Sequence, residues 1–180
     1  MPTKTSSARV TNTSREKTHQ IGVVIPCYKV KDQILDVLQG IGKEVSRIYV
    51  VDDACPEKTG NFVKSRTKDK RVEVLFHEHN QGVGGAVITG YRAALADGVQ
   101  VIVKIDGDGQ MNPQLIPTIA RPVVEGSSDY SKGNRFDSLE NLISMPKVRI
   151  FGNAVLSLWS KVSSGYWTVT DPTNGFTAIH

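Results

Sequence analysis

The sequence predicts an α/β protein with a mostly parallel sheet and helices on both of its faces. Short apolar segments that read as buried strands alternate with stretches in which apolar residues recur every three to four positions. Such alternation is typical of parallel strands joined by crossover helices. Acidic residues directly follow two of the expected strands, and in open α/β sheets this edge binds ligands.

The first elements are two strands, each followed by a helix. We expect a strand at 20–25 that stops at Pro26, because proline cannot donate to a ladder. Apolar residues at helical spacing between Val30 and Ile41 predict the first helix. The second strand is expected at 47–51, and Pro56 is expected to open the second helix.

The next strand and helix are more clearly marked. Residues 72–76 predict the third strand, and 82–97 predict the third helix, with Gly98 as its stop. One face of that helix carries the larger apolar side chains, namely Val83, Val87, Tyr91 and Leu95. We expect this face to pack on the sheet.

The second half of the chain continues the alternation. The fourth strand is expected at 101–105, and Asn112 is expected to cap a helix that Pro113 starts and that Pro117 and Pro122 keep short or kinked. A further strand is expected near 129–132. A later helix is expected over 147–163, with apolar residues at Val148, Phe151, Val155, Leu158 and Val162. Residues 175–180 read as the beginning of another strand, so we expect the chain to be cut short.

Composition favours one soluble domain at 20–180, preceded by a tail at 1–19. The net charge is +4, and the tail is Ser/Thr-rich and basic, which predicts disorder. The body has no charge field that suggests nucleic-acid binding, and no 18-residue apolar run predicts a transmembrane helix. Cys27 and Cys55 are expected to be reduced thiols in a cytoplasmic protein, without the neighbours that a zinc site needs.

The loop after the fourth strand is the strongest chemical signal. Asp106 and Asp108 stand two residues apart, and Gly107 and Gly109 allow backbone angles that other residues resist. Two hard oxygen donors this close can hold a divalent cation whose shell is completed by substrate phosphates. The loop therefore predicts a site for a metal that carries a diphosphate.

Three other readings of the glycine and acidic motifs fail on the residues. A calcium EF-hand that started at Asp106 would need glycine at its sixth position and glutamate at its twelfth, where Met111 and Pro117 stand. A dinucleotide fold would need its glycine fingerprint after the first strand, and that position holds Pro26. The Gly-Lys-Ser/Thr of a phosphate P-loop is absent from the sequence.

A second acidic pair, Asp52-Asp53, follows the second strand. At a strand end it suits the hydroxyls or base edge of a nucleotide, although acids in this position also cap the next helix. Gly82 opens the third helix nearby, with Gly84 and Gly85 behind it, where small residues permit close backbone approach and the helix start favours anions. Simple packing of helix on sheet explains these glycines equally well.

Four motifs follow one another in a fixed order along the chain: Val24-Ile25-Pro26-Cys27-Tyr28, Val51-Asp52-Asp53, Asn80-Gln81-Gly82 and the Asp-x-Asp motif of Asp106-Gly107-Asp108-Gly109-Gln110. This ordered set resembles that of family-2 glycosyltransferases. Later segments are similar to dolichyl- or polyprenyl-phosphate mannose and glucose synthases, namely Gly133-Asn134-Arg135-Phe136, Arg149, Asn153 and 171–176. The resemblance implies a GT-A fold with a Rossmann-like sheet, a nucleotide-sugar donor (GDP- or UDP-hexose), and Mg²⁺ or Mn²⁺.

The resemblance also implies roles for individual residues. The nucleoside pocket would be lined by Pro26, Tyr28, Asp53 and Gly82. Asp52 would lie beside Asp53. Asp106, Asp108 and Gln110 would hold the metal and the diphosphate. Three further residues would receive the acceptor phosphate: Arg135, Arg149 and Asn153. The family usually carries Asn-Glu after the tyrosine of its first motif, where this chain has Lys29-Val30.

The residues fit a phosphate acceptor. Arg149 and Asn153 are four positions apart and share one helix face, and the arginine fork suits phosphate oxygens. A lipid phosphate is anionic near neutral pH, so it needs no strong base to attack the anomeric carbon. A hydroxyl acceptor would need a base, and Asp171 is the candidate.

Three functional hypotheses follow. The first is a metal-dependent inverting transfer of a hexose to polyprenyl phosphate (dolichyl or undecaprenyl) at the cytosolic face of a membrane. The second is the same chemistry with a saccharide hydroxyl as acceptor. The third is a nucleotide-sugar-binding module without turnover. Members of the family often continue into transmembrane or amphipathic helices, so we expect the full-length protein to meet a membrane surface.

Overall fold

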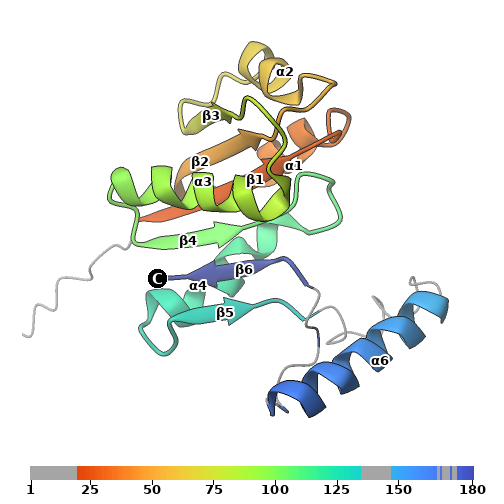
Figure 1. Ribbon diagram of the computed structural model, residues 1–180. Coiled ribbons are helices and arrows are strands. Elements are labelled where there is room, and N and C mark those ends of the chain that lie inside the picture. Colours follow the sequence, from red (N-terminus) through yellow and green to blue (C-terminus); the bar gives the residue numbers. More distant parts are fainter. Residues whose placement is uncertain (1–19, 135–146, 166, 168–170, 172–173) are drawn as a thin grey trace, which may run out of the picture.

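A single six-stranded sheet organises the protein (Figure 1). The computed structural model describes residues 20–134, 147–165, 167, 171 and 174–180. The strands are β1 (Ile21–Cys27), β2 (Val45–Asp52), β3 (Val72–Phe76), β4 (Val101–Lys104), β5 (Tyr130–Lys132) and β6 (Thr177–Ile179). The helices are α1 (Ile34–Gly40), α2 (Thr59–Arg66), α3 (Gly82–Ala96), the 3₁₀ turn η1 (Pro113–Leu115), α4 (Ile116–Val124) and α6 (Lys147–Ser164). The predicted α/β class is confirmed.

The strand order places a topological switch beside β1. The order is β3-β2-β1-β4-β6-β5, and the first four of these strands are parallel. The chain first moves from β1 outward to β2 and β3, and then returns to place β4 on the other side of β1. In open α/β sheets the crevice at such a reversal, at the carboxyl ends of the strands, binds ligands.

Helices cover both faces of the sheet. Successive side chains of β1 point to opposite faces, so each face has its own core. Val23 and Ile25 join a core with Ile34 of α1 and Ala120 of α4. Val24 belongs to the second core, which α3 covers. These two cores place the sheet between two helical layers.

Helix α3 packs on the sheet through its small residues, and our assignment of its buried face was wrong. Its buried residues are Ala86, Gly90 and Ala94, spaced four apart, whereas Val83 and Leu95 are exposed. A Cβ at Gly90 would collide with Val24. Small residues let the helix axis approach the sheet closely, and this gain in contact outweighs the burial of the larger side chains.

Strand β1 continues through Pro26, where we expected it to stop. The carbonyl of Val24 accepts from the N–H of Ile105, and the carbonyl of Cys27 accepts from the N–H of Asp53. The N–H and C=O groups of successive β1 residues therefore point alternately toward β4 and toward β2. The backbone of Pro26 points toward β4, but the pairing of β1 with β4 ends before Pro26, at Val24 and Lys104. The missing N–H of proline removes no ladder bond there.

Helix α2 begins at Thr59, three residues later than Pro56 predicts. Pro56 lies in a turn, and Lys58 adopts a left-handed conformation with φ of 52°. The expected cap at Asn112 is confirmed, since its side chain accepts from the N–H of Gln114. The other predicted strands and helices are present. The first helix begins at Ile34, four residues after Val30, and the ends of the remaining elements shift by at most two residues.

The C-terminal strand is paired on both sides. Strand β6 lies between β4 and β5 and is antiparallel to each of them. Helix α6 stands apart from the sheet in Figure 1 and exposes most of its described apolar side chains, including Val155, Leu158, Trp159 and Val162. Among the described residues, no helix combines the length and the hydropathy needed to cross a membrane.

Candidate active site

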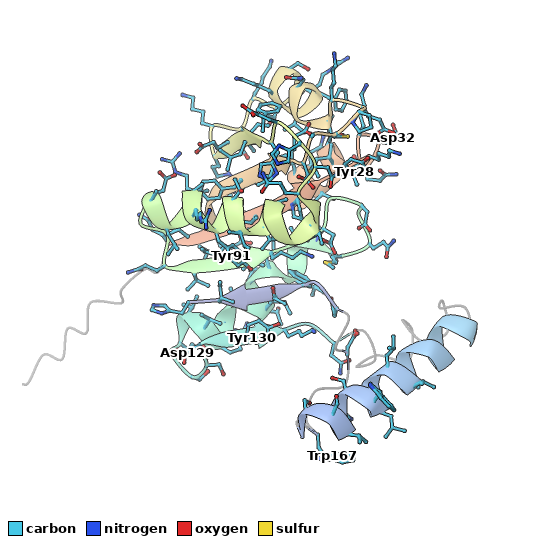
Figure 2. The ribbon with its side chains drawn as sticks, in the orientation of Figure 1. Tyr28, Asp32, Tyr91, Asp129, Tyr130 and Trp167 are labelled. Atoms are coloured by element: carbon cyan, nitrogen blue, oxygen red, sulfur yellow. The ribbon has the colours of Figure 1, made fainter. Side chains whose placement is uncertain are left out.

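One cavity of about 470 Å³ lies at the carboxyl ends of β1, β2 and β4, which is the edge that the sequence motifs predict. This volume is that of a small-molecule site. Figure 2 shows Tyr28 at this end of the sheet. The cavity is lined by Pro26, Cys27, Tyr28, Val30, Asp53, Asn80, Gly82, Val83, Ala86, Asp106, Gly107 and Asp108. Residues from four separate motifs therefore meet in one hollow.

The acidic loop forms one wall of the cavity. Gly107 is buried, and a Cβ there would lie 3.1 Å from Val30. Gly109 has φ of 73°, a conformation that glycine adopts without strain. The exposed Asp108 accepts a hydrogen bond from the N–H of Gln110 at 3.0 Å. Gln110 contributes this backbone contact but does not line the cavity.

Asp106 is ion-paired with Lys104, a residue that sequence reasoning missed. Lys104 Nζ donates to Asp106 Oδ1, and the lysine side chain is only 11% exposed. The lysine therefore neutralises this carboxylate inside the protein. A lysine within the apolar run 101–105, at the last position of β4, was the available signal, because a buried charge needs a partner.

The segment before β6 closes against this ion pair. A Cβ on Gly175 would collide with Lys104 Nζ and would lie 3.0 Å from Asp106 Oδ2. Asn174 stabilises the segment by accepting from the N–H of Phe176 at 3.0 Å. A side chain at position 175 would therefore force Lys104 or Asp106 to move.

Replacing Gly175 by alanine should therefore disable the acidic loop. The added methyl group displaces Lys104 or Asp106, so we expect at least about a tenfold loss of metal-dependent nucleotide affinity, measured by calorimetry, since a disturbed charge pair costs more than 1.4 kcal/mol. Gly152→Ala is the matched control, because a Cβ at Gly152 meets nothing within 4 Å. Equal affinity in both variants would show that Gly175 does not support the loop.

Asp53 also lines the cavity. It is almost fully buried, and its Oδ1 accepts from the N–H of Gln81 at 2.8 Å and contacts His77 Nδ1 at 2.7 Å. Burial by itself would raise the pKa of Asp53, but the hydrogen bonds from Gln81 and His77 outweigh it and hold the pKa below its usual value. Asp53 is therefore an ionised acceptor at neutral pH.

Asp52 has different partners. Its two carboxylate oxygens accept from the backbone N–H groups of Cys55 and Gly60, at 2.7 and 2.5 Å. Asp52 does not line the cavity; its side chain holds the turn into α2. The structure therefore brings Pro26, Tyr28 and Gly82 together with Asp53 in the cavity. Asp52 is not among the residues that line it.

The loops that follow β1 and β2 each contain a residue in a strained backbone conformation. Lys29 and Ala54 have φ of 57° and 51°, values that favour glycine. The Lys29 N–H donates to Cys55 Sγ at 3.1 Å, which ties the two loops together. Cys27 and Cys55 are both buried free thiols, as expected. Strain of this kind concentrates at binding sites, and residue type alone did not reveal it.

The acceptor residues are described only in part. Asp171 is buried, and its carbonyl accepts from the N–H of Asn174 in the segment that closes on Asp106. Arg135 and the side chains of Arg149 and Asn153 lie outside the described residues, although helix α6 carries the last two.

The residues present fit a divalent cation shared with a substrate. In the described part of the chain, no group of three His, Cys, Asp or Glu side chains could hold a metal alone. Asp106 and Asp108 nevertheless both line the same cavity. A pair of hard donors with room beside them suits Mg²⁺ or Mn²⁺ that takes its remaining ligands from phosphates and water.

Fold and cavity together define an α/β protein of the GT-A type, with an acidic ligand site at the switch point of its sheet. The chain belongs to glycosyl transferase family 2, whose family model matches residues 22–179. The resemblance noted in the sequence is thereby confirmed.

Named relatives come from archaea and bacteria. The chain is 30% identical over 173 residues to a UDP-N-acetylglucosamine–dolichyl-phosphate N-acetylglucosaminyltransferase of Methanococcus voltae, covering 88% of this chain and 68% of the relative. It is 31% identical to an undecaprenyl-phosphate mannosyltransferase of Micrococcus luteus, covering 86% and 64%. The chain thus spans about two thirds of the length of these relatives.

A solved structure supports the fold. The glucosyl-3-phosphoglycerate synthase of Mycobacterium tuberculosis, crystallised with Mn²⁺, UDP and glucosyl-3-phosphoglycerate, superposes with a TM-score of 0.66 at 18% identity. The match covers 89% of this chain and 56% of that enzyme. At this identity the similarity shows the GT-A fold alone.

Proposed function

We propose that this chain is the catalytic domain of a metal-dependent, inverting glycosyltransferase that moves a hexose from a nucleotide sugar to a polyprenyl phosphate. The observation that carries the proposal is that Asp53, Asp106 and Asp108, from two separate motifs, line the same cavity. Family membership supports the reaction class.

The nucleoside half of a UDP- or GDP-hexose would lie against Asp53. Ionised Asp53 accepts hydrogen bonds from base or ribose donors, and the half-exposed Tyr28 offers an aromatic surface, with Pro26 beside it. Gly82 lines the cavity and opens α3, and the free N–H groups at a helix start favour an anion. The diphosphate would then extend from α3 toward the acidic loop.

Asp106 and Asp108, with Gln110 behind them, would hold Mg²⁺ or Mn²⁺ at the diphosphate. The bound cation supplies positive charge to the departing nucleoside diphosphate. The residues of the chain hold the donor in line: Lys104 fixes Asp106, and Gly175 lets the closing segment cover the pair. In-line attack by the acceptor on the anomeric carbon inverts its configuration.

A lipid phosphate is the acceptor that several observations favour. The named relatives act on dolichyl and undecaprenyl phosphates. Helix α6 carries Arg149 and Asn153 on its first turns and exposes apolar side chains further along, with Trp159 73% exposed. A helix with basic and apolar parts of this kind suits the cytosolic face of a membrane. In the proposal Arg135, Arg149 and Asn153 bind the acceptor phosphate.

A hydroxyl acceptor is the second candidate, with Asp171 as its general base. Asp171 is buried, and its carbonyl accepts from the N–H of Asn174, next to the glycine that lies against Asp106, which supports this candidate. Donor binding without turnover is the third candidate.

Product formation from radiolabelled donor separates the candidates. The 180-residue chain is incubated with UDP- or GDP-hexoses and Mn²⁺, with polyprenyl phosphate in liposomes, with soluble saccharides, or with no acceptor. The proposal expects label in the lipid fraction only when polyprenyl phosphate is present. Label in the saccharide fraction instead would establish a hydroxyl acceptor, and donor binding with no product would establish a binding module.

A further inference from the structure

His77 connects the nucleoside wall to helix α3. The side chain is 5% exposed and lies one residue beyond β3. Its Nδ1 is 2.7 Å from Asp53 Oδ1, and its Nε2 is 2.9 Å from the hydroxyl of Thr89, in the middle of α3. The backbone N–H of His77 also donates to the carbonyl of Asp52 at 3.0 Å, which prolongs the pairing of β2 and β3. Both ring nitrogens are therefore engaged.

The ionised Asp53 determines which ring nitrogen of His77 carries the hydrogen that points toward it. Ionised Asp53 can only accept, so the imidazole must present Nδ1–H to it. In the neutral ring Nε2 then accepts from the Thr89 hydroxyl, and in the cationic ring Nε2–H donates to it. Because a hydroxyl serves in either role, Thr89 fixes the plane of the ring in both states.

The ring in turn restricts Asp53. Oδ1 of Asp53 is held by two partners from different segments, the Gln81 N–H at the start of α3 and the ring of His77. The Asn80 amide adds a bond to the Asp53 carbonyl at 3.3 Å. Two directional bonds on one oxygen set the plane of the carboxylate, and therefore the direction in which it can accept from a ligand.

We propose that His77, held by Thr89, is a positioning residue that orients Asp53 for the nucleoside of the donor. The inference rests on the proposed function, because it assigns a purpose to the nucleoside side of the same cavity. His77 and Thr89 do not line the cavity, so they act through Asp53.

A double-mutant cycle on nucleotide binding tests this role. UDP and GDP are titrated by calorimetry into the 180-residue chain with Mn²⁺, and the nucleotide that binds the wild type more tightly is used throughout. We expect His77→Ala to weaken binding about tenfold in the wild-type background and less than about twofold in Asp53→Asn, because contacting residues couple. His79→Ala is the matched control, since His79 is an exposed histidine two positions away.

Three conservative variants keep the test valid if His77→Ala folds poorly. His77→Asn retains an N–H near the Nδ1 position and should stay within about threefold of wild type. Thr89→Val keeps the shape but removes the hydroxyl, and should weaken binding by about threefold, with Thr89→Ser restoring it. In the transfer assay these losses should appear in the KM for the donor and not in kcat, because ground-state binding is lost.

The outcomes separate this inference from the proposed function. If His77→Ala weakens binding equally with Asp53 and with Asn at position 53, His77 does not act through Asp53. If Thr89→Val binds as wild type, Thr89 does not hold His77. Either result overturns the inference and leaves the proposed function standing. If the wild-type chain binds neither UDP nor GDP, the proposed function fails and the inference fails with it.

Discussion

Asp106→Asn and Asp108→Asn should each abolish metal-dependent donor binding and reduce turnover by about a hundredfold or more. Asparagine keeps the shape of the side chain but removes the charge that attracts a divalent cation. A metal at a phosphoryl group supplies several kcal/mol, and each 1.4 kcal/mol is about tenfold in rate. Calorimetry of UDP and GDP with and without Mn²⁺, together with the labelled-donor assay, measures both effects.

The two variants should differ in stability, and this difference is an internal control. Asp108 is exposed and accepts only a local backbone bond, so Asp108→Asn should leave the Tm close to that of wild type. Asp106→Asn leaves the Lys104 ammonium without its carboxylate partner, so a lower Tm is expected. Undiminished turnover in both variants, or full activity in excess chelator, would contradict the metal site.

Arg149→Ala should reduce transfer to polyprenyl phosphate by one to several decades while nucleotide affinity barely changes. A phosphate acceptor loses a charge-assisted contact at the attacking group, and each roughly 1.4 kcal/mol is tenfold in rate. Arg149→Lys should restore activity only in part, because an ammonium cannot reproduce the two-pronged guanidinium contact. The labelled-donor assay with liposomal acceptor gives the rates, and calorimetry gives the nucleotide affinity.

Asp171→Asn provides the comparison that decides between acceptors. A phosphate nucleophile needs no general base, so this variant should lose less activity than Arg149→Ala. The reverse ranking, with Asp171→Asn inactive and Arg149→Ala near normal, would overturn the polyprenyl-phosphate proposal in favour of a hydroxyl acceptor. Because Asp171 is buried, the Tm of Asp171→Asn must be measured beside its rate.

The elements of the fold could be predicted where periodicity and composition agreed. Strand β3 has the predicted bounds, and α3 ends one residue early. Predictions were wrong where a rule based on neighbouring residues was overridden by contacts in the folded protein. Pro26 continues β1 because its missing N–H points to a side where no partner strand remains. Helix α3 buries Gly90 instead of Leu95, since closeness to Val24 decides its orientation.

The candidate site was also predictable in part. Asp53, Asp106 and Asp108 follow strands, and parallel strands end at a common edge, so the sequence indicated that they would meet. The sequence did not indicate that Asp52, next to Asp53, would hold the turn into α2. Adjacent residues at a strand end point in opposite directions, and only the packed sheet shows which one faces the ligand.

The sequence by itself determined the α/β class, the family, and the motifs that supply the carboxylates of the cavity. Only the tertiary structure decided how those carboxylates are held. Lys104 pairs with Asp106 beneath Gly175, and His77 joins Asp53 to Thr89. These partners are far apart along the chain or carry no motif. Their contacts exist because buried charges and polar groups need partners, and the folded backbone determines which partners are within reach.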